Sequence, residues 1–171
     1  MKNLSQKETS LLKDQLTHEK VCIEKYRDYA ATTQDQQLKQ LFQNLAQQEQ
    51  QHYNTITQIL NGQVPSTNTN QAGQNQQQMS PQNQQGGGQT QNYAGSPSTG
   101  MQNAAGTNNA SLCNDMLMTE KYVSGAYNTA IFEFTDANVR QALNHIQKEE
   151  QQHGEAIFNY MQNKGMYNVQ G

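Results

Sequence analysis

An internal repeat constrains the fold of this chain more than any other feature. Shifting the sequence by 101 positions aligns residues 10–60 with residues 111–161 without a gap, and fourteen of the 51 aligned residues are identical. The identities include a Glu-Gln-Gln-His run at 49–52 and again at 150–153, and Gln-rich composition alone would not supply its Glu and His. Neither copy contains proline. One ancestral helix hairpin used twice is the simplest explanation.

The segment between the two copies has a different character. Residues 62–110 contain no Asp, Glu, Lys or Arg and hold all three prolines, and runs of Gln, Asn and Gly fill the rest. Such a composition buries too little apolar surface to offset the entropy lost on ordering. We therefore expect a disordered linker over 62–110. The flanking segments, 1–61 and 111–171, are then the two hairpins.

Both copies show the 3.6-residue period of amphipathic helices. Ser5 with Glu8 predicts a capping box at the first helix, Asp35 an N-cap at the second, and Gly62 the end of that helix. Four helices of about 25 residues predict an all-α fold, a four-helix bundle. The apolar positions are Leu12, Leu16, Ile23, Tyr26 and Ala30; Leu38, Phe42, Leu45, Ile56 and Ile59; Leu112, Met116, Val123, Tyr127, Ile131 and Phe134; and Val139, Leu143, Ile146, Ile157 and Tyr160.

Titratable residues interrupt each of these apolar faces where the period requires an apolar side chain. They are Glu19, Glu49, His52, Glu120, Glu150 and His153. Burying an ionised carboxylate without a partner is very costly, and no Lys or Arg occupies the apolar faces. A pair of metal ions would supply the compensating positive charge.

The spacing of these residues supports a metal site. Residues three apart lie on one face of a helix, so each Glu-x-x-His can reach one metal pair. A Glu from two helices and a Glu-x-x-His from the other two is the ligand set of di-iron and di-manganese carboxylate proteins. The alternative is that hydrogen bonds among the six residues, Tyr26 and Tyr127 satisfy them without metal. The two tyrosines are either supporting donors behind the ligands or ordinary core aromatics.

Other features exclude several functions or predict surface positions. No apolar run spans a bilayer, and a net charge of −3 gives no footprint for nucleic acid. The two cysteines are expected to be buried, inert thiols. Residues expected at the surface are Glu24, Asp28, Lys148, Glu149 and Glu155, with His18 and His145 beside the apolar faces; the cysteines are Cys22 and Cys113.

The sequence resembles two known groups. The six residues on the apolar faces resemble the metal-ligand pattern of the ferritin-like superfamily across both copies. The second copy resembles the spore coat protein F family, through Leu-Cys-Asn-Asp at 112–115, Glu-Lys at 120–121 and the Lys-Gly-x-Tyr-Asn-Val ending at 164–169. This resemblance implies synthesis in the mother-cell cytoplasm, deposition in the spore coat and other coat proteins as partners, with a homo-oligomer as a further possibility.

The ferritin-like resemblance implies roles for the ligands. Glu49 and Glu150 would bridge two iron or manganese ions, Glu19 and Glu120 would be terminal carboxylates, and His52 and His153 would give one imidazole each. Such a centre would react with oxygen or peroxide. A purely structural coat protein without metal and an iron-storage protein are the alternatives, and the sequence does not choose between iron and manganese.

Overall fold

A computed structural model describes residues 3–63 and 99–166 as helices joined by short turns, with side chains described at 3–63 and 108–166. The elements are α1 (Gln6–Thr32), α2 (Gln36–Leu60), α3 (Thr99–Ile131) and α4 (Ala137–Asn163). The described residues contain no strand, which confirms the predicted all-α fold. No helix among them combines the length and the apolar character that a membrane span requires.

The predicted helix ends are confirmed. The Ser5 side chain accepts from the backbone N–H of Glu8, and the Glu8 carboxylate accepts from the backbone N–H of Ser5, which forms the capping box. Asp35 caps α2, whose end is followed by Gly62 at φ 82°, a backbone conformation that favours glycine. Glu8 also accepts from the backbone N–H of Thr135 at 2.9 Å and so links α1 to the α3–α4 turn.

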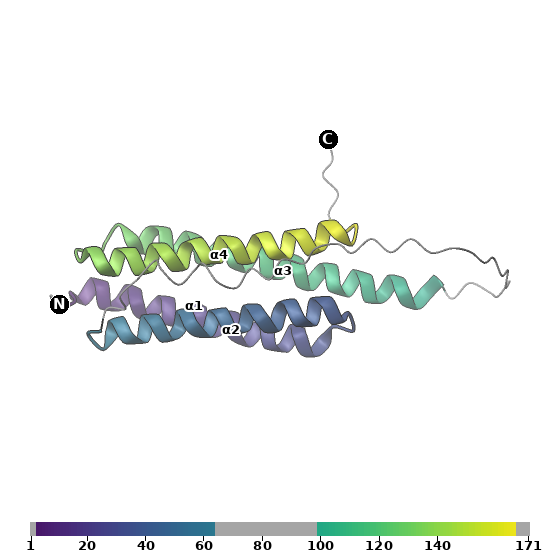
Figure 1. Ribbon diagram of the computed structural model, residues 1–171, viewed down its shortest axis with the longest axis horizontal. Coiled ribbons are helices and arrows are strands. Elements are labelled where there is room, and N and C mark those ends of the chain that lie inside the picture. Colours follow the sequence, from purple (N-terminus) through teal and green to yellow (C-terminus); the bar gives the residue numbers. More distant parts are fainter. Residues whose placement is uncertain (1–2, 64–98, 167–171) are drawn as a thin grey trace, which may run out of the picture.

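The four helices form two antiparallel hairpins that pack side by side (Figure 1). α1 packs against α2 and α3 against α4, and the hairpins meet through α1 with α3 and α2 with α4. α2 and α3 run in the same direction, which is the topology of a bundle with one long crossover (Figure 1). The largest fully buried apolar side chains include Tyr26, Tyr127, Phe42, Leu38 and Ile157.

The structure differs from the expected pattern at three places. α3 begins at Thr99 rather than near 111, because no proline follows Pro97 and alanines support helix there. Asn109 at the expected end of the linker is buried and accepts from the Thr33 hydroxyl at 2.8 Å. Leu16 and Leu112 are only half-buried at the edge of the core. The expectation of disorder over 64–98 lies outside the described residues.

Candidate metal centre

All six titratable residues predicted on the apolar faces meet in the middle of the bundle. α1 contributes Glu19, α2 contributes Glu49 and His52, and the second hairpin supplies their repeat-related counterparts. Each of the six is at most 3% exposed. The helical period brings them together because each occupies an inward position that aliphatic residues fill elsewhere on the same face. The six residues are Glu19, Glu49, His52, Glu120, Glu150 and His153.

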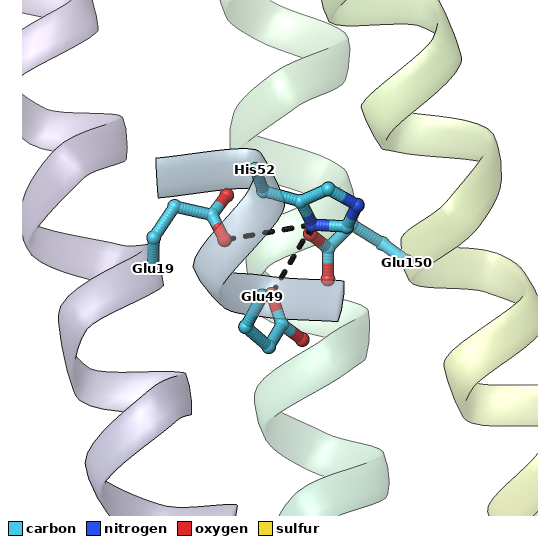
Figure 2. A group of neighbouring side chains, drawn as sticks. All are labelled: Glu19, Glu49, His52 and Glu150. Atoms are coloured by element: carbon cyan, nitrogen blue, oxygen red, sulfur yellow. Dashed lines mark hydrogen bonds and ion pairs between the residues drawn. The ribbon is translucent and has the colours of Figure 1, made fainter. Parts of the chain in front are cut away.

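Their ligand atoms form two overlapping groups, in each of which the atoms lie within 4.8 Å of one another. The first group combines Glu19 and His52 with Glu49 and Glu150, and Figure 2 shows these side chains converging from three helices. His52 Nδ1 lies 3.0 Å from Glu150 Oε1, 3.2 Å from Glu49 Oε2 and 3.6 Å from Glu19 Oε2. One imidazole nitrogen therefore faces three carboxylates.

The second group combines Glu120 and His153 with the same two carboxylates, Glu49 and Glu150. His153 Nδ1 lies 3.0 Å from Glu49 Oε1, 3.8 Å from Glu120 Oε2 and 3.9 Å from Glu150 Oε2. The two imidazole rings stack, with centroids 5.4 Å apart and 15° between their planes. Glu49 and Glu150 thus belong to both groups, whereas the other four residues belong to one group each.

The outer nitrogen of each imidazole is held by the opposite hairpin. His52 Nε2 lies 3.0 Å from Glu149 Oε2, and His153 Nε2 lies 2.6 Å from Gln48 Oε1. Gln48 and Glu149 are repeat-related, so both hairpins use the same position for this contact. The prediction of Glu149 as a surface residue without a role at the site is therefore wrong. The sequence pattern of α4 alone does not reveal this contact, because the partner of Glu149 is His52 on α2.

The two tyrosines hold carboxylates across the interface between hairpins. Tyr26 of α1 donates its hydroxyl hydrogen bond to Glu120, and Tyr127 of α3 donates to Glu19. Both tyrosines are fully buried, and Tyr26 also packs on the Phe42 ring with centroids 5.6 Å apart. They are thus core aromatics and hydrogen-bond donors at once.

The remaining titratable residues and thiols mostly lie where the sequence predicts. Both cysteines are free and buried, and burial raises the pKa of Cys113 to about 12, so neither favours the reactive thiolate. His18 is half-buried with its ring against Tyr122. The exposed residues are Glu24, Asp28, His145, Lys148 and Glu155.

Burial governs the protonation of the centre. Loss of hydration raises the pKa of Glu19 to about 7, and it also raises the pKa values of Glu49, Glu120 and Glu150, to which neighbouring carboxylates add. Burial alone would lower the pKa of His52, but hydrogen bonds to carboxylates outweigh it and raise this pKa well above its ordinary value. In the absence of a cation, protons bound to these carboxylates and imidazoles therefore offset the buried negative charge.

Carboxylate oxygens without hydrogen-bond partners test whether these residues fit metal ions. Within the described part of the chain, Glu19 Oε2, Glu120 Oε2 and both Glu150 oxygens are buried without a hydrogen-bond partner, because each imidazole Nδ1 faces three carboxylates and carries at most one proton. Buried polar atoms in native proteins nearly always have partners. Carboxylate oxygens and imidazole nitrogens are ligands that iron and manganese accept, so the donor set fits two such ions.

Comparison with known families bears on the second hairpin. Residues 108–170 match the Coat F domain. The match confirms the resemblance to the spore coat protein F family and covers half of the candidate centre, namely Glu120, Glu150 and His153. No curated protein and no solved structure matches the chain.

Proposed function

We propose that this protein is a spore coat component with a di-metal centre of the ferritin-like type. The observation that carries the proposal is the pair of overlapping ligand groups that share Glu49 and Glu150, with four buried carboxylate oxygens that have no hydrogen-bond partner among the described residues. The direction of α2 and α3 supports it, since a single long crossover is found in ferritin-like bundles. The Coat F domain supports the coat location and other coat proteins as partners.

The membership of the two groups suggests a role for each ligand. Glu49 and Glu150 would contact both ions, whereas Glu19 and Glu120 would each contact one. His52 and His153 would bind through Nδ1, since Glu149 and Gln48 accept from the outer Nε2 and fix both rings. Iron or manganese held in this way would supply one-electron chemistry toward oxygen or peroxide.

The protein's own groups prepare this chemistry. Tyr26 and Tyr127 fix the orientation of Glu120 and Glu19, so that the second oxygen of each carboxylate faces the cluster. The apolar side chains above and below the six residues exclude bulk water, which strengthens every interaction between a carboxylate and a cation. Each hairpin supplies half of the donors, so the centre needs both.

A shared ligand gives the sharpest test. Glu49→Ala should lose most of both ions, because Glu49 belongs to both groups. The variant should also lose the ability to oxidise ferrous iron or to decompose peroxide. Glu24→Ala and Glu155→Ala, at exposed positions, are the matched controls and should keep both. A wild-type protein that is metal-free after growth with iron and manganese, and inert in both assays, would contradict the proposed centre. A structural role in the coat would then be the only function that remains.

A further inference from the structure

The inner contacts of the candidate ligands match between the two ligand groups. Each imidazole Nδ1 faces Glu49, Glu150 and one further carboxylate, which is Glu19 in the first group and Glu120 in the second. That further carboxylate accepts a hydrogen bond from a tyrosine of the opposite hairpin in both cases. The two groups are therefore built from the same residue types in the same arrangement.

The outer contacts of the two imidazoles differ in charge. His52 Nε2 lies 3.0 Å from a carboxylate oxygen of Glu149, whereas His153 Nε2 lies 2.6 Å from the amide oxygen of Gln48. Glu149 and Gln48 occupy the same position of the repeat. The outer acceptor is thus anionic behind the first group and neutral behind the second.

Glu149 is placed to act on an ion through the ring of His52. Its side chain is 35% exposed, but the His52 side chain between it and the cluster is only 3% exposed, so little water screens its charge on that side. A hydrogen bond to an ionised acceptor is about twice as strong as one to a neutral acceptor. A carboxylate behind an imidazole also makes the imidazole a more basic ligand, which strengthens its bond to a metal ion. His145 approaches the same Glu149 oxygen at 3.5 Å, but it is exposed, and solvent weakens that contact.

The first group is also the more compact of the two. Oxygens of its three carboxylates lie 3.0, 3.2 and 3.6 Å from His52 Nδ1. The corresponding oxygens of the second group lie 3.0, 3.8 and 3.9 Å from His153 Nδ1. Ligand atoms that already lie close together need less rearrangement to enclose one ion. Compactness and outer charge therefore favour the same group.

We infer that the ion bound by the first group is held more tightly than the ion bound by the second, so that the two positions fill in sequence. This inference rests on the proposed di-metal centre and adds an order of filling to it. Glu149 is the positioning residue that sets the order, because it orients His52 and supplies the additional negative charge. A protein supplied with a single ion per chain should hold that ion mainly beside Glu19 and His52.

Repeat-related variants separate the two positions. Glu120→Ala removes a ligand that only the second group has, and Glu19→Ala removes one that only the first group has. Each metal-free variant is titrated with Mn²⁺, and free Mn²⁺ is measured by its electron paramagnetic resonance signal. The affinity found is that of the ion position that remains. The Glu120→Ala protein should bind its ion about tenfold more tightly than the Glu19→Ala protein.

Exchange of the outer acceptors tests the cause of this difference. Glu149→Gln in the Glu120→Ala protein should weaken Mn²⁺ binding about tenfold, and Gln48→Glu in the Glu19→Ala protein should strengthen it about tenfold. Gln47→Glu in the Glu19→Ala protein is the matched control, because it adds the same charge at the neighbouring exposed position of α2. This control should leave Mn²⁺ affinity unchanged.

Equal affinities in the Glu19→Ala and Glu120→Ala proteins, or the reverse order, overturn the inference. It is also overturned if the exchanged acceptors leave both affinities unchanged, or if Gln47→Glu strengthens binding as much as Gln48→Glu does.

If neither single variant holds Mn²⁺, titration of the protein with both groups intact decides. Two binding phases that Gln48→Glu brings together support the order of filling, whereas a single phase, or phases that stay apart, overturn it. A wild-type protein that binds no Mn²⁺ overturns this inference, and if elemental analysis finds no iron either, the proposed function is overturned with it.

Discussion

Acidification should stabilise the metal-free protein, which is the reverse of the usual behaviour of proteins with ion-paired carboxylates. The perturbation is a change from about pH 8 to about pH 5 in the presence of a chelator. The buried carboxylates at the centre have pKa values raised above their ordinary values, chiefly by loss of hydration. The folded state therefore binds protons that the unfolded state releases in this range, so the free energy of unfolding rises as pH falls.

The magnitude can be worked for one residue. The pKa of Glu19 rises from 4.5 to about 7 on folding. Each unit is worth about 1.4 kcal/mol, so this carboxyl alone contributes about 3 kcal/mol between pH 8 and pH 5. For a domain of this size that corresponds to roughly 10 °C in melting temperature. His52 acts in the same direction, because its raised pKa favours the charged form in the folded state below that value.

Other groups set the lower limit of this trend. The pKa of Glu8 falls to about 2 because backbone N–H groups of Ser5 and Thr135 hydrogen-bond to its carboxylate, and the pKa of Asp35 is lowered by its hydrogen bond to Lys164. Their stabilisation is complete above the ordinary carboxyl pKa and is lost as pH falls toward their folded values. His153, whose pKa burial lowers, opposes the trend just below neutral pH. Stability should therefore peak near pH 5.

Thermal unfolding followed by circular dichroism across this range measures the effect. Glu19→Gln should flatten the profile by raising stability at pH 8, whereas Glu24→Gln, at an exposed position, should leave the profile unchanged. The metal-loaded protein should show the opposite slope, since protons compete with metal for the same ligands. A melting temperature of the chelated protein that falls steadily from pH 8 to pH 5 would refute the reasoning.

Two further predictions concern residues that support the ligands. Glu149→Gln should weaken metal affinity at least about tenfold in a competition titration, because Glu149 accepts from His52 Nε2, and unchanged affinity would contradict this role. Tyr26→Phe should lower the free energy of unfolding of the metal-free protein by about 1–3 kcal/mol in urea, because it removes the hydrogen bond to Glu120. Tyr122→Phe, at an exposed position, is its control, and equal stability of the two variants would count against the prediction.

The sequence predicts those features that depend on one helix at a time. A capping box such as Ser5 with Glu8 is local, and a Glu or His on an apolar face must be buried whatever the partner helix is. The convergence of six such residues then follows from bundle packing. The repeat adds the register, because Glu49 and Glu150 occupy matching heights in their hairpins.

Contacts between the two hairpins cannot be predicted from the pattern of one helix at a time. Glu149 looks like a surface residue on its own helix, and only the approach of α2 to α4 brings it to His52. The hydrogen bonds of Tyr26 and Tyr127 to carboxylates of the opposite hairpin depend on side-chain direction in the same way. Composition does not predict the start of α3 at Thr99, because a polar, charge-free segment can still continue a helix.

Metal content tests the central claim most directly. Elemental analysis of wild-type protein, purified after expression with iron and manganese, should find about two ions per chain, as the two overlapping ligand groups predict. A variant with both His52→Ala and His153→Ala should lose most of this metal while its circular dichroism stays helical. A wild-type protein without iron or manganese, or a double variant with undiminished metal content, would contradict the account.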